Sequence, residues 1–230
     1  MPALSKIVLF DLDDTLTCHR AAFAQWAQGF AQESGVPVRW LVEAEERWAG
    51  RRAAFFDEVQ RTFGIDRSVL SMQAAYRRRT AELVPFRPEV CDALDRLVGE
   101  GWLMGLVTNG EAVAQRTKLH QARLTRFFPR GVVISSEIGL RKPDPALFRL
   151  ALDDLGARDV TAYVVGDDLH ADVHGALAAR LIPVWVSHGR RLGPEDPQPA
   201  HVAEGVVDAI EWLRTTAARN LLATAAQALA

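Results

Sequence analysis

The stretch Lys6-Ile7-Val8-Leu9-Phe10-Asp11-Leu12-Asp13-Asp14-Thr15-Leu16 decides the fold of this chain. Its first part, over residues 6–11, is a short continuous apolar run with β-branched residues, which is typical of a strand covered on both faces. Its second part places three carboxylates, those of Asp11, Asp13 and Asp14, where that strand should end. The stretch therefore predicts a buried strand that leads into an acidic loop.

The acidic loop is suited to phosphoryl transfer. Three neighbouring carboxylates repel one another unless a cation or a proton offsets their charge, and Mg²⁺ would supply that charge. Phosphate monoester hydrolysis is among the slowest uncatalysed reactions, so it needs a positioned nucleophile and neutralisation of the phosphoryl oxygens. Asp11 can act as the nucleophile, and Asp13 can protonate the leaving oxygen and later activate water. Taken alone, this motif is also compatible with a turn that carries an acidic helix cap.

After this loop, from Arg20 to Ala81, the sequence pattern becomes helical. Apolar residues recur there at helical spacing, with no comparable strand signal, and they begin with Phe23, Trp26, Ala27, Phe30 and Ala31. Gly35-Val36-Pro37 and Gly64-Ile65-Asp66 interrupt the segment. We expect an all-helical insert of three or four helices over residues 17–82.

The remainder of the chain alternates between strand and helix patterns. Further strands are predicted over 103–108, 132–135, 162–166 and 182–186. Helices are predicted over 88–99, 111–122, 145–155, 172–179 and 206–214. Such alternation implies right-handed crossovers and a mostly parallel sheet. We therefore predict an α/β fold, with a Rossmann-like doubly wound core of about five strands over 1–16 and 83–230, a small helical cap domain, and a possible C-terminal helical extension over 215–230.

Two more polar motifs are expected at the same edge of the sheet as the acidic loop, because ligands of parallel sheets bind outside the carboxyl ends of the strands. Thr108-Asn109-Gly110 offers a hydroxyl, an amide and a helix N-terminus that suit phosphate oxygens, although ordinary turn chemistry explains it equally well. Lys142 is one of only three lysines among 27 basic residues. Its compact ammonium can neutralise a transferring phosphoryl group, and a solvated surface lysine is the alternative.

The last motif follows the strand predicted over 162–166 and adds Asp167, Asp168 and Asp172. We expect Asp167 to bind the metal and Asp172 to orient Lys142 or the metal shell. Asp168 could exchange roles with either of them.

Composition narrows the class of protein. The chain has 230 residues, 49% of them hydrophobic, and a formal net charge of −2. It therefore has no overall electrostatic reason to bind nucleic acid or an anionic membrane. No stretch approaches the roughly 20 apolar residues of a membrane span, and Cys18 and Cys91 lack metal-ligand spacing. We expect a reduced, cytoplasmic protein, a monomer or homodimer, whose partner is a small phosphorylated metabolite.

The four motifs, in this order, resemble those of the haloacid dehalogenase-like superfamily, specifically its phosphatases with a helical cap inserted after the first motif. The resemblance covers essentially the whole chain. It implies a five-stranded parallel core with the first strand central and the strand before Asp167 beside it. It also implies that Mg²⁺ binds the carboxylates of Asp11 and Asp167 and the main-chain carbonyl of Asp13. Thr108, Asn109 and Lys142 would then hold the phosphate.

The resemblance implies a phosphoric monoester hydrolase that uses Mg²⁺ and an aspartyl phosphate on Asp11. Expected substrates are small, such as a nucleoside monophosphate, a sugar phosphate or phosphoglycolate. Dehalogenases of this superfamily lack an aspartate two positions after the nucleophile, so Asp13 disfavours dehalogenation. A phosphomutase keeps both aspartates and remains an alternative, as do a phosphoacceptor domain and a non-catalytic binding domain.

Overall fold

The computed structural model describes residues 6–48, 51–158 and 160–216. The chain divides into two compact units, one formed by Met1–Thr17 with Phe86–Ala230 and the other by Cys18–Pro85. The helix that covers residues 206–216 ends the described part. The predicted extension over 215–230 therefore lies, except for its first two residues, outside the described residues.

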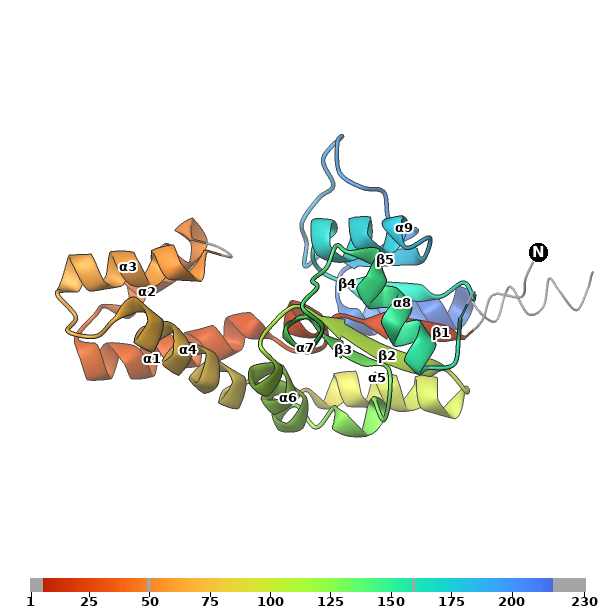
Figure 1. Cartoon of the computed structure of the whole chain (residues 1–230), viewed down its shortest axis with the longest axis horizontal. Coiled ribbons are helices and arrows are strands. Elements are labelled where there is room, and N and C mark those ends of the chain that lie inside the picture. Colours follow the sequence, from red (N-terminus) through yellow and green to blue (C-terminus); the bar gives the residue numbers. More distant parts are fainter. Residues whose placement is uncertain (1–5, 49–50, 159, 217–230) are drawn as a thin grey trace, which may run out of the picture. The chain divides into compact units, whose positions relative to one another are not determined.

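The larger unit contains a six-stranded sheet in the order β3-β2-β1-β4-β5-β6, with every neighbouring pair parallel (Figure 1). Its strands are β1 (Ile7–Phe10), β2 (Leu103–Thr108), β3 (Val132–Ile134), β4 (Tyr163–Gly166), β5 (Ile182–Val186) and β6 (His201–Ala203). The predicted doubly wound α/β fold is confirmed. The sixth strand was missed because β6 is a three-residue edge strand that follows a proline-rich stretch and carries no run of apolar residues.

Helices connect these strands. They are η1 (Leu12–Leu16), α5 (Pro88–Gly99), α6 (Ala112–Gln121), η2 (Thr125–Phe127), α7 (Ser135–Ile138), α8 (Pro145–Asp154), η3 (Leu169–His174) and α9 (Gly175–Ala178). The helix predicted over 172–179 begins earlier, at Leu169, because the Asp168 side chain accepts hydrogen bonds from the main-chain N–H groups of His170 and Ala171.

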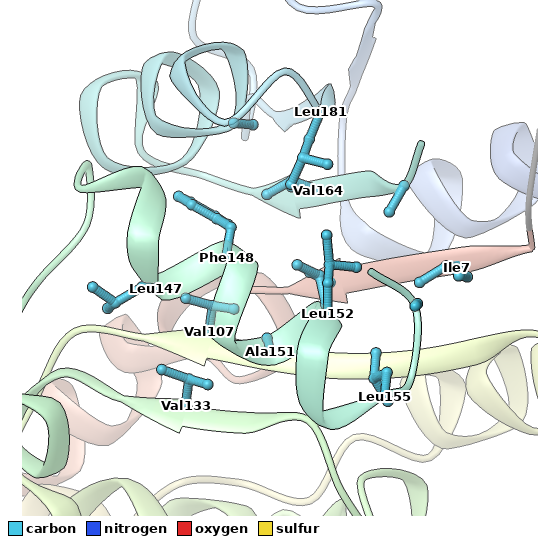
Figure 2. Close-up of a cluster of buried hydrophobic side chains, with 14 residues drawn as sticks. Ile7, Val107, Val133, Leu147, Phe148, Ala151, Leu152, Leu155, Val164 and Leu181 are labelled. Carbon is cyan, nitrogen blue, oxygen red and sulfur yellow. The ribbon is translucent and has the colours of Figure 1, made fainter. Parts of the chain in front are cut away.

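One face of the sheet packs against α8. Figure 2 shows apolar side chains of this helix facing apolar side chains of four strands. The facing residues are Leu147, Phe148, Ala151, Leu152 and Leu155 on α8, and Ile7, Val107, Val133 and Val164 on the strands. Side chains alternate along a strand, so Val8 and Phe10 point to the opposite face. There the Phe10 ring lies 6.4 Å from that of Phe128. β1 is thus buried on both faces, as its continuous apolar run predicts.

The central position of β1 determines where the acidic loop lies. Phe10 is aligned with Leu106 of β2 on one side and with Val165 of β4 on the other. The main-chain N–H of Asp11 donates to the carbonyl of Val165 at 2.9 Å. Strand order reverses on either side of β1, and such a switch point is where ligands bind in open α/β sheets.

The described residues of the smaller unit form four helices, α1 (His19–Ser34), α2 (Val38–Arg47), α3 (Arg52–Phe63) and α4 (Val69–Glu82). Gly35 and Gly64 adopt left-handed conformations that end α1 and α3, as the glycine pattern of the sequence indicates. Its core is largely aromatic, and the Trp26 ring stacks on Phe30 at 4.9 Å. None of the helices in the described part of the chain is long and apolar enough to cross a membrane.

Candidate functional site

The backbone turns sharply after β1. Within Leu12–Leu16, Asp13 is extended and Asp14 adopts a left-handed conformation with φ of 54°. Aspartate tolerates this conformation better than most residues because its short side chain is polar. The Nε2 atom of His188 donates to the main-chain carbonyl of Asp14 at 2.5 Å. Because of this kink, the chain turns at the carboxyl end of β1, and Asp11 and Asp13 both lie there.

A buried lysine joins two of the predicted carboxylates. The Lys142 Nζ atom lies 2.6 Å from Asp11 Oδ1 and 2.6 Å from Asp172 Oδ1. The exposed fractions of Asp11, Lys142 and Asp172 are only 7%, 4% and 2%. A buried ammonium is costly unless it is paired and hydrogen-bonded, and here one ammonium is hydrogen-bonded to two carboxyl groups. Asp172 therefore lies against Lys142, in a position that fits one of its two predicted roles, that of orienting this lysine.

Asn109 fixes the loop that carries Lys142. Its Nδ2 atom donates to the main-chain carbonyl of Lys142 at 3.1 Å, and its Oδ1 atom accepts from the main-chain N–H of Lys142 at 2.8 Å. The next residue, Gly110, donates its N–H to Ser135 Oγ at 2.9 Å. Asn109 thus connects the end of β2 to the lysine loop through both polar atoms of its amide.

The three aspartates that follow β4, Asp167, Asp168 and Asp172, make different contacts. Asp167 Oδ2 lies 3.2 Å from Arg190 Nη2, and its main-chain carbonyl accepts from the indole N–H of Trp185 at 2.9 Å. The Asp168 side chain is exposed and caps η3. Asp172 uses its second oxygen, Oδ2, to accept the main-chain N–H of Asp168 at 3.1 Å. Asp167 and Asp172 therefore face the site, whereas Asp168 stabilises the helix that follows.

Burial changes the acidity of these groups. Desolvation raises the pKa of Asp11 to about 8, with Lys142 opposing that rise. Desolvation, together with repulsion from Asp172 and Asp14, raises the pKa of Asp167 to about 7. Burial alone would lower the pKa of Lys142, but attraction to Asp11 and Asp172 outweighs it and the pKa is raised. Lys142 thus stays protonated, whereas Asp11 and Asp167 ionise less readily than free aspartates, and a nearby divalent cation would lower the pKa of both carboxyl groups.

Three carboxylates lie close enough to share a cation. Asp11, Asp167 and Asp172 each offer an oxygen, and these oxygens all lie within 4.8 Å of one another. A set made only of carboxylate oxygens suits hard divalent cations such as Mg²⁺. The Asp13 side chain does not join these three carboxylates and instead contacts helix α6. Its main-chain carbonyl is the group that the family resemblance predicts as a metal ligand. The residues present fit a Mg²⁺ site.

Two residues of the site escaped the sequence analysis. Lys118 Nζ lies 2.7 Å from each carboxylate oxygen of Asp13, and Gln115 Nε2 donates to Asp13 Oδ2 at 3.0 Å and to Thr108 Oγ1 at 2.6 Å. Thr108 and Gln115 are each 1% exposed. The scarcity of lysine, which drew attention to Lys142, is a signal that applies to Lys118 as well.

Comparisons with known proteins agree with one another. Residues 5–180 match the family model of haloacid dehalogenase-like hydrolases. A phosphoserine phosphatase from Thermus thermophilus is 35% identical, over 77% of this chain and 73% of its own. A glyceraldehyde 3-phosphate phosphatase from Methanopyrus kandleri is 34% identical, over 88% of this chain and 93% of its own. The structure of the magnesium-bound HAD-hydrolase YfnB from Bacillus subtilis, 20% identical, superposes with a TM-score of 0.75 over 91% of this chain and 99% of its own.

Proposed function

Because this chain belongs to the haloacid dehalogenase-like hydrolase family, we propose that it is a Mg²⁺-dependent phosphatase that hydrolyses a small phosphomonoester through an aspartyl phosphate on Asp11. The observation that carries this proposal is the buried Asp11–Lys142–Asp172 arrangement beside Asp167 at the carboxyl edge of the sheet. It combines a carboxylate nucleophile with the positive charge that a transferring phosphoryl group needs.

In the first step, a carboxylate oxygen of Asp11 attacks phosphorus, and the bond between phosphorus and the leaving oxygen breaks. Asp13 gives its proton to that oxygen, so the product departs as an alcohol. Lys142 is held within 2.6 Å of Asp11, where its ammonium neutralises charge on the phosphoryl oxygens. Thr108, at the end of β2, offers a hydroxyl to the same oxygens.

In the second step, water hydrolyses the aspartyl phosphate. Asp13 accepts a proton from the water while its oxygen forms a bond to phosphorus, and the bond between phosphorus and Asp11 breaks. Inorganic phosphate leaves and both aspartates return to their starting states. Asn109 contributes indirectly, because its amide holds the main chain of Lys142 through two hydrogen bonds.

The carboxylates of Asp11 and Asp167, with the main-chain carbonyl of Asp13, are the groups we propose for Mg²⁺. When bound, the ion offsets the repulsion among these carboxylates and neutralises charge on the phosphoryl group. Asp172 is the third of the three neighbouring carboxylates. We assign it to positioning Lys142, with which it is hydrogen-bonded, and not to the metal.

We assign Cys18–Pro85 as the cap domain, because this unit is inserted directly after the acidic loop. The catalytic core comprises the remaining residues. Two of the relatives act, by their names, on phosphoserine and on glyceraldehyde 3-phosphate. We therefore add three-carbon phosphomonoesters to the candidate substrates that the sequence suggests, which are nucleoside monophosphates, sugar phosphates and phosphoglycolate.

The test is inorganic phosphate release from a panel of these compounds, with and without Mg²⁺. We expect Mg²⁺-dependent release by the wild type and a loss on the order of 10³-fold or more in Asp11→Asn. Asp153→Asn, which alters an exposed carboxylate paired with Arg158, serves as the matched control. Conversion of a substrate to an isomeric phosphate without phosphate release would identify a phosphomutase instead. Release that survives in Asp11→Asn would contradict the mechanism.

A further inference from the structure

Helix α6 contacts the side chain of the proposed general acid and base. Lys118 Nζ lies 2.7 Å from both oxygens of Asp13, and Gln115 Nε2 donates to Asp13 Oδ2 at 3.0 Å. Gln115 and Lys118 stand three residues apart, so they share one face of the helix. The same Gln115 nitrogen also donates to Thr108 Oγ1 at 2.6 Å. One helix face thus holds both a carboxylate and a hydroxyl of the site.

These contacts differ from an ordinary surface ion pair. Lys118 is 9% exposed and Gln115 is 1% exposed. Lysine is almost never this buried unless it is paired, because removing its charge from water is costly. Two donors from different side chains converge on a single carboxylate, which fixes the position of both its oxygens and the plane of the group. An isolated surface pair would fix neither.

The backbone makes room for this arrangement. A Cβ atom at position 110 would lie 2.8 Å from the Cδ atom and 2.9 Å from the Cγ atom of Gln115. Gly110 has no positive φ, so the need for glycine there comes from the space that Gln115 occupies. Glycine at the end of the Thr108-Asn109-Gly110 motif therefore leaves the space that Gln115 occupies when it contacts Asp13.

We propose that Gln115 and Lys118 are positioning residues that hold the Asp13 carboxyl group in the orientation from which it exchanges protons with the leaving oxygen and with water. This inference rests on the proposed phosphatase function. The extended backbone of Asp13 sits in a kinked segment and does not itself determine where the side chain points. A catalytic group displaced by about 1 Å loses on the order of 10²-fold in rate, so an external clamp has a catalytic consequence.

This positioning role can be tested by comparing substrates whose leaving groups differ in their need for a proton. An alkyl phosphate needs a proton on its departing oxygen, whereas p-nitrophenyl phosphate releases a stable anion and needs that proton far less. In Lys118→Met, kcat/KM for the alkyl substrate should fall by about 10- to 100-fold, and kcat/KM for p-nitrophenyl phosphate by less than about 3-fold. Lys118→Arg keeps the cation and should restore part of the alkyl activity. Equal losses for both substrates, or a raised KM with unchanged kcat, would overturn the proposal.

A double-mutant cycle with Asp13→Asn separates positioning from structural damage. If Lys118 acts through Asp13, Lys118→Met should lower kcat/KM for the alkyl substrate no further once Asp13 is asparagine. Additive losses would overturn the proposal. Gln115→Met, which buries no charge and conserves volume, provides the same test if Lys118→Met does not fold. Absence of Asp11-dependent phosphate release by the wild type would reject the proposed function, whereas release with an unchanged leaving-group ratio in both variants would reject only the clamp.

Discussion

A Cβ atom at Gly166 would overlap the carboxyl group of Asp172, so the last residue of β4 must be glycine for that carboxylate to lie across the strand. Asp172 needs this position to reach Lys142, which it contacts at 2.6 Å. Glycine at position 166 therefore also affects the position of Asp11, the proposed nucleophile, since the same Lys142 ammonium contacts Asp11.

Gly166→Ala should consequently damage both folding and catalysis. The added methyl group displaces Asp172 and forces a shift in a packed interior, and we expect a loss of about 1–3 kcal/mol in the free energy of unfolding. Phosphate release should fall by more than about 10-fold, because Lys142 loses a partner. Urea unfolding and steady-state assays measure these effects. Gly99→Ala, where a Cβ would meet no atom within 4 Å, is the control and should be neutral or slightly stabilising. Equal behaviour of the two variants would contradict this account.

Removing the Asn109 amide should lower both stability and kcat. Asn109→Leu leaves the main-chain N–H and carbonyl of Lys142 without their side-chain partner, which costs about 1–3 kcal/mol in stability. The looser lysine loop should lower kcat by roughly 10²-fold, because charge neutralisation depends on a fixed position. Gln60→Leu is the control, because it also deletes a hydrogen bond from a side-chain amide to a main-chain carbonyl but lies in the helical unit, and it should leave kcat unchanged. An Asn109→Leu enzyme with wild-type kcat would refute this role.

The metal-free protein should lose stability as the pH rises from about 5 to 8. The pKa values of Asp11 and Asp167 are raised to about 8 and about 7, so the folded state holds protons in this range that the unfolded state has already released. Stability then falls with rising pH, by at most about 1.4 kcal/mol per pH unit for each carboxyl group. Mg²⁺ replaces those protons. The increase in Tm on adding Mg²⁺ should therefore be larger at pH 8 than at pH 5.5, and a Tm increase that does not grow with pH would contradict the assignment.

The helical unit should respond to pH in the opposite direction. Burial alone would raise the pKa of Glu45, but hydrogen bonds from His19 and Arg52 and the charge of Arg52 lower it to about 2. This carboxylate therefore contributes stability above pH 4.5, and that contribution disappears as the pH falls toward 2.

Glu45→Gln should thus lower the free energy of unfolding by about 1–3 kcal/mol at pH 7, and the difference from the wild type should shrink as the pH falls below 4.5. Urea unfolding at several pH values measures it. Glu43→Gln is the matched control on the same helix, because Glu43 forms an exposed pair with Arg39 and its replacement should change stability by about 0.5 kcal/mol or less. A difference for Glu45→Gln that is independent of pH would exclude the ionic explanation.

Much of the site could be predicted from the sequence because the relevant residues follow strands. Asp11, Thr108 and Asp167 each stand at the end of an apolar run, and a parallel sheet brings such ends to one edge whatever the details of packing. The prediction that β1 is central came from the family resemblance and not from the hydrophobic pattern. A buried strand has the same continuous apolar pattern at any interior position of a parallel sheet.

Residues on helices were harder to predict. Gln115 and Lys118 occupy one face of α6, but helical spacing does not say whether that face meets a sheet, solvent or a catalytic carboxylate. The role of Asp168 was left open for a similar reason. The sequence allowed Asp168 to exchange roles with Asp167 or Asp172, and its capping of η3 was not predicted because it depends on where that helix begins. These distinctions depend on tertiary contacts that a single sequence does not encode locally.

The central position of β1 also has a consequence for the order in which the protein forms. Asp11, the proposed nucleophile, follows β1, and β1 is synthesised before the strands that it pairs with: β2 follows the entire helical insert, and β4 comes later still. Contacts so distant along the chain form slowly, because a long loop must close before they contribute. The contacts within the four-helix unit join residues that are closer in sequence, so we expect them to form before β1 pairs with β2 and β4. Until β4 is synthesised, the chain lacks Asp167 and one edge of β1 is unpaired, so one segment supplies both the proposed metal ligand and protection from edge-to-edge aggregation.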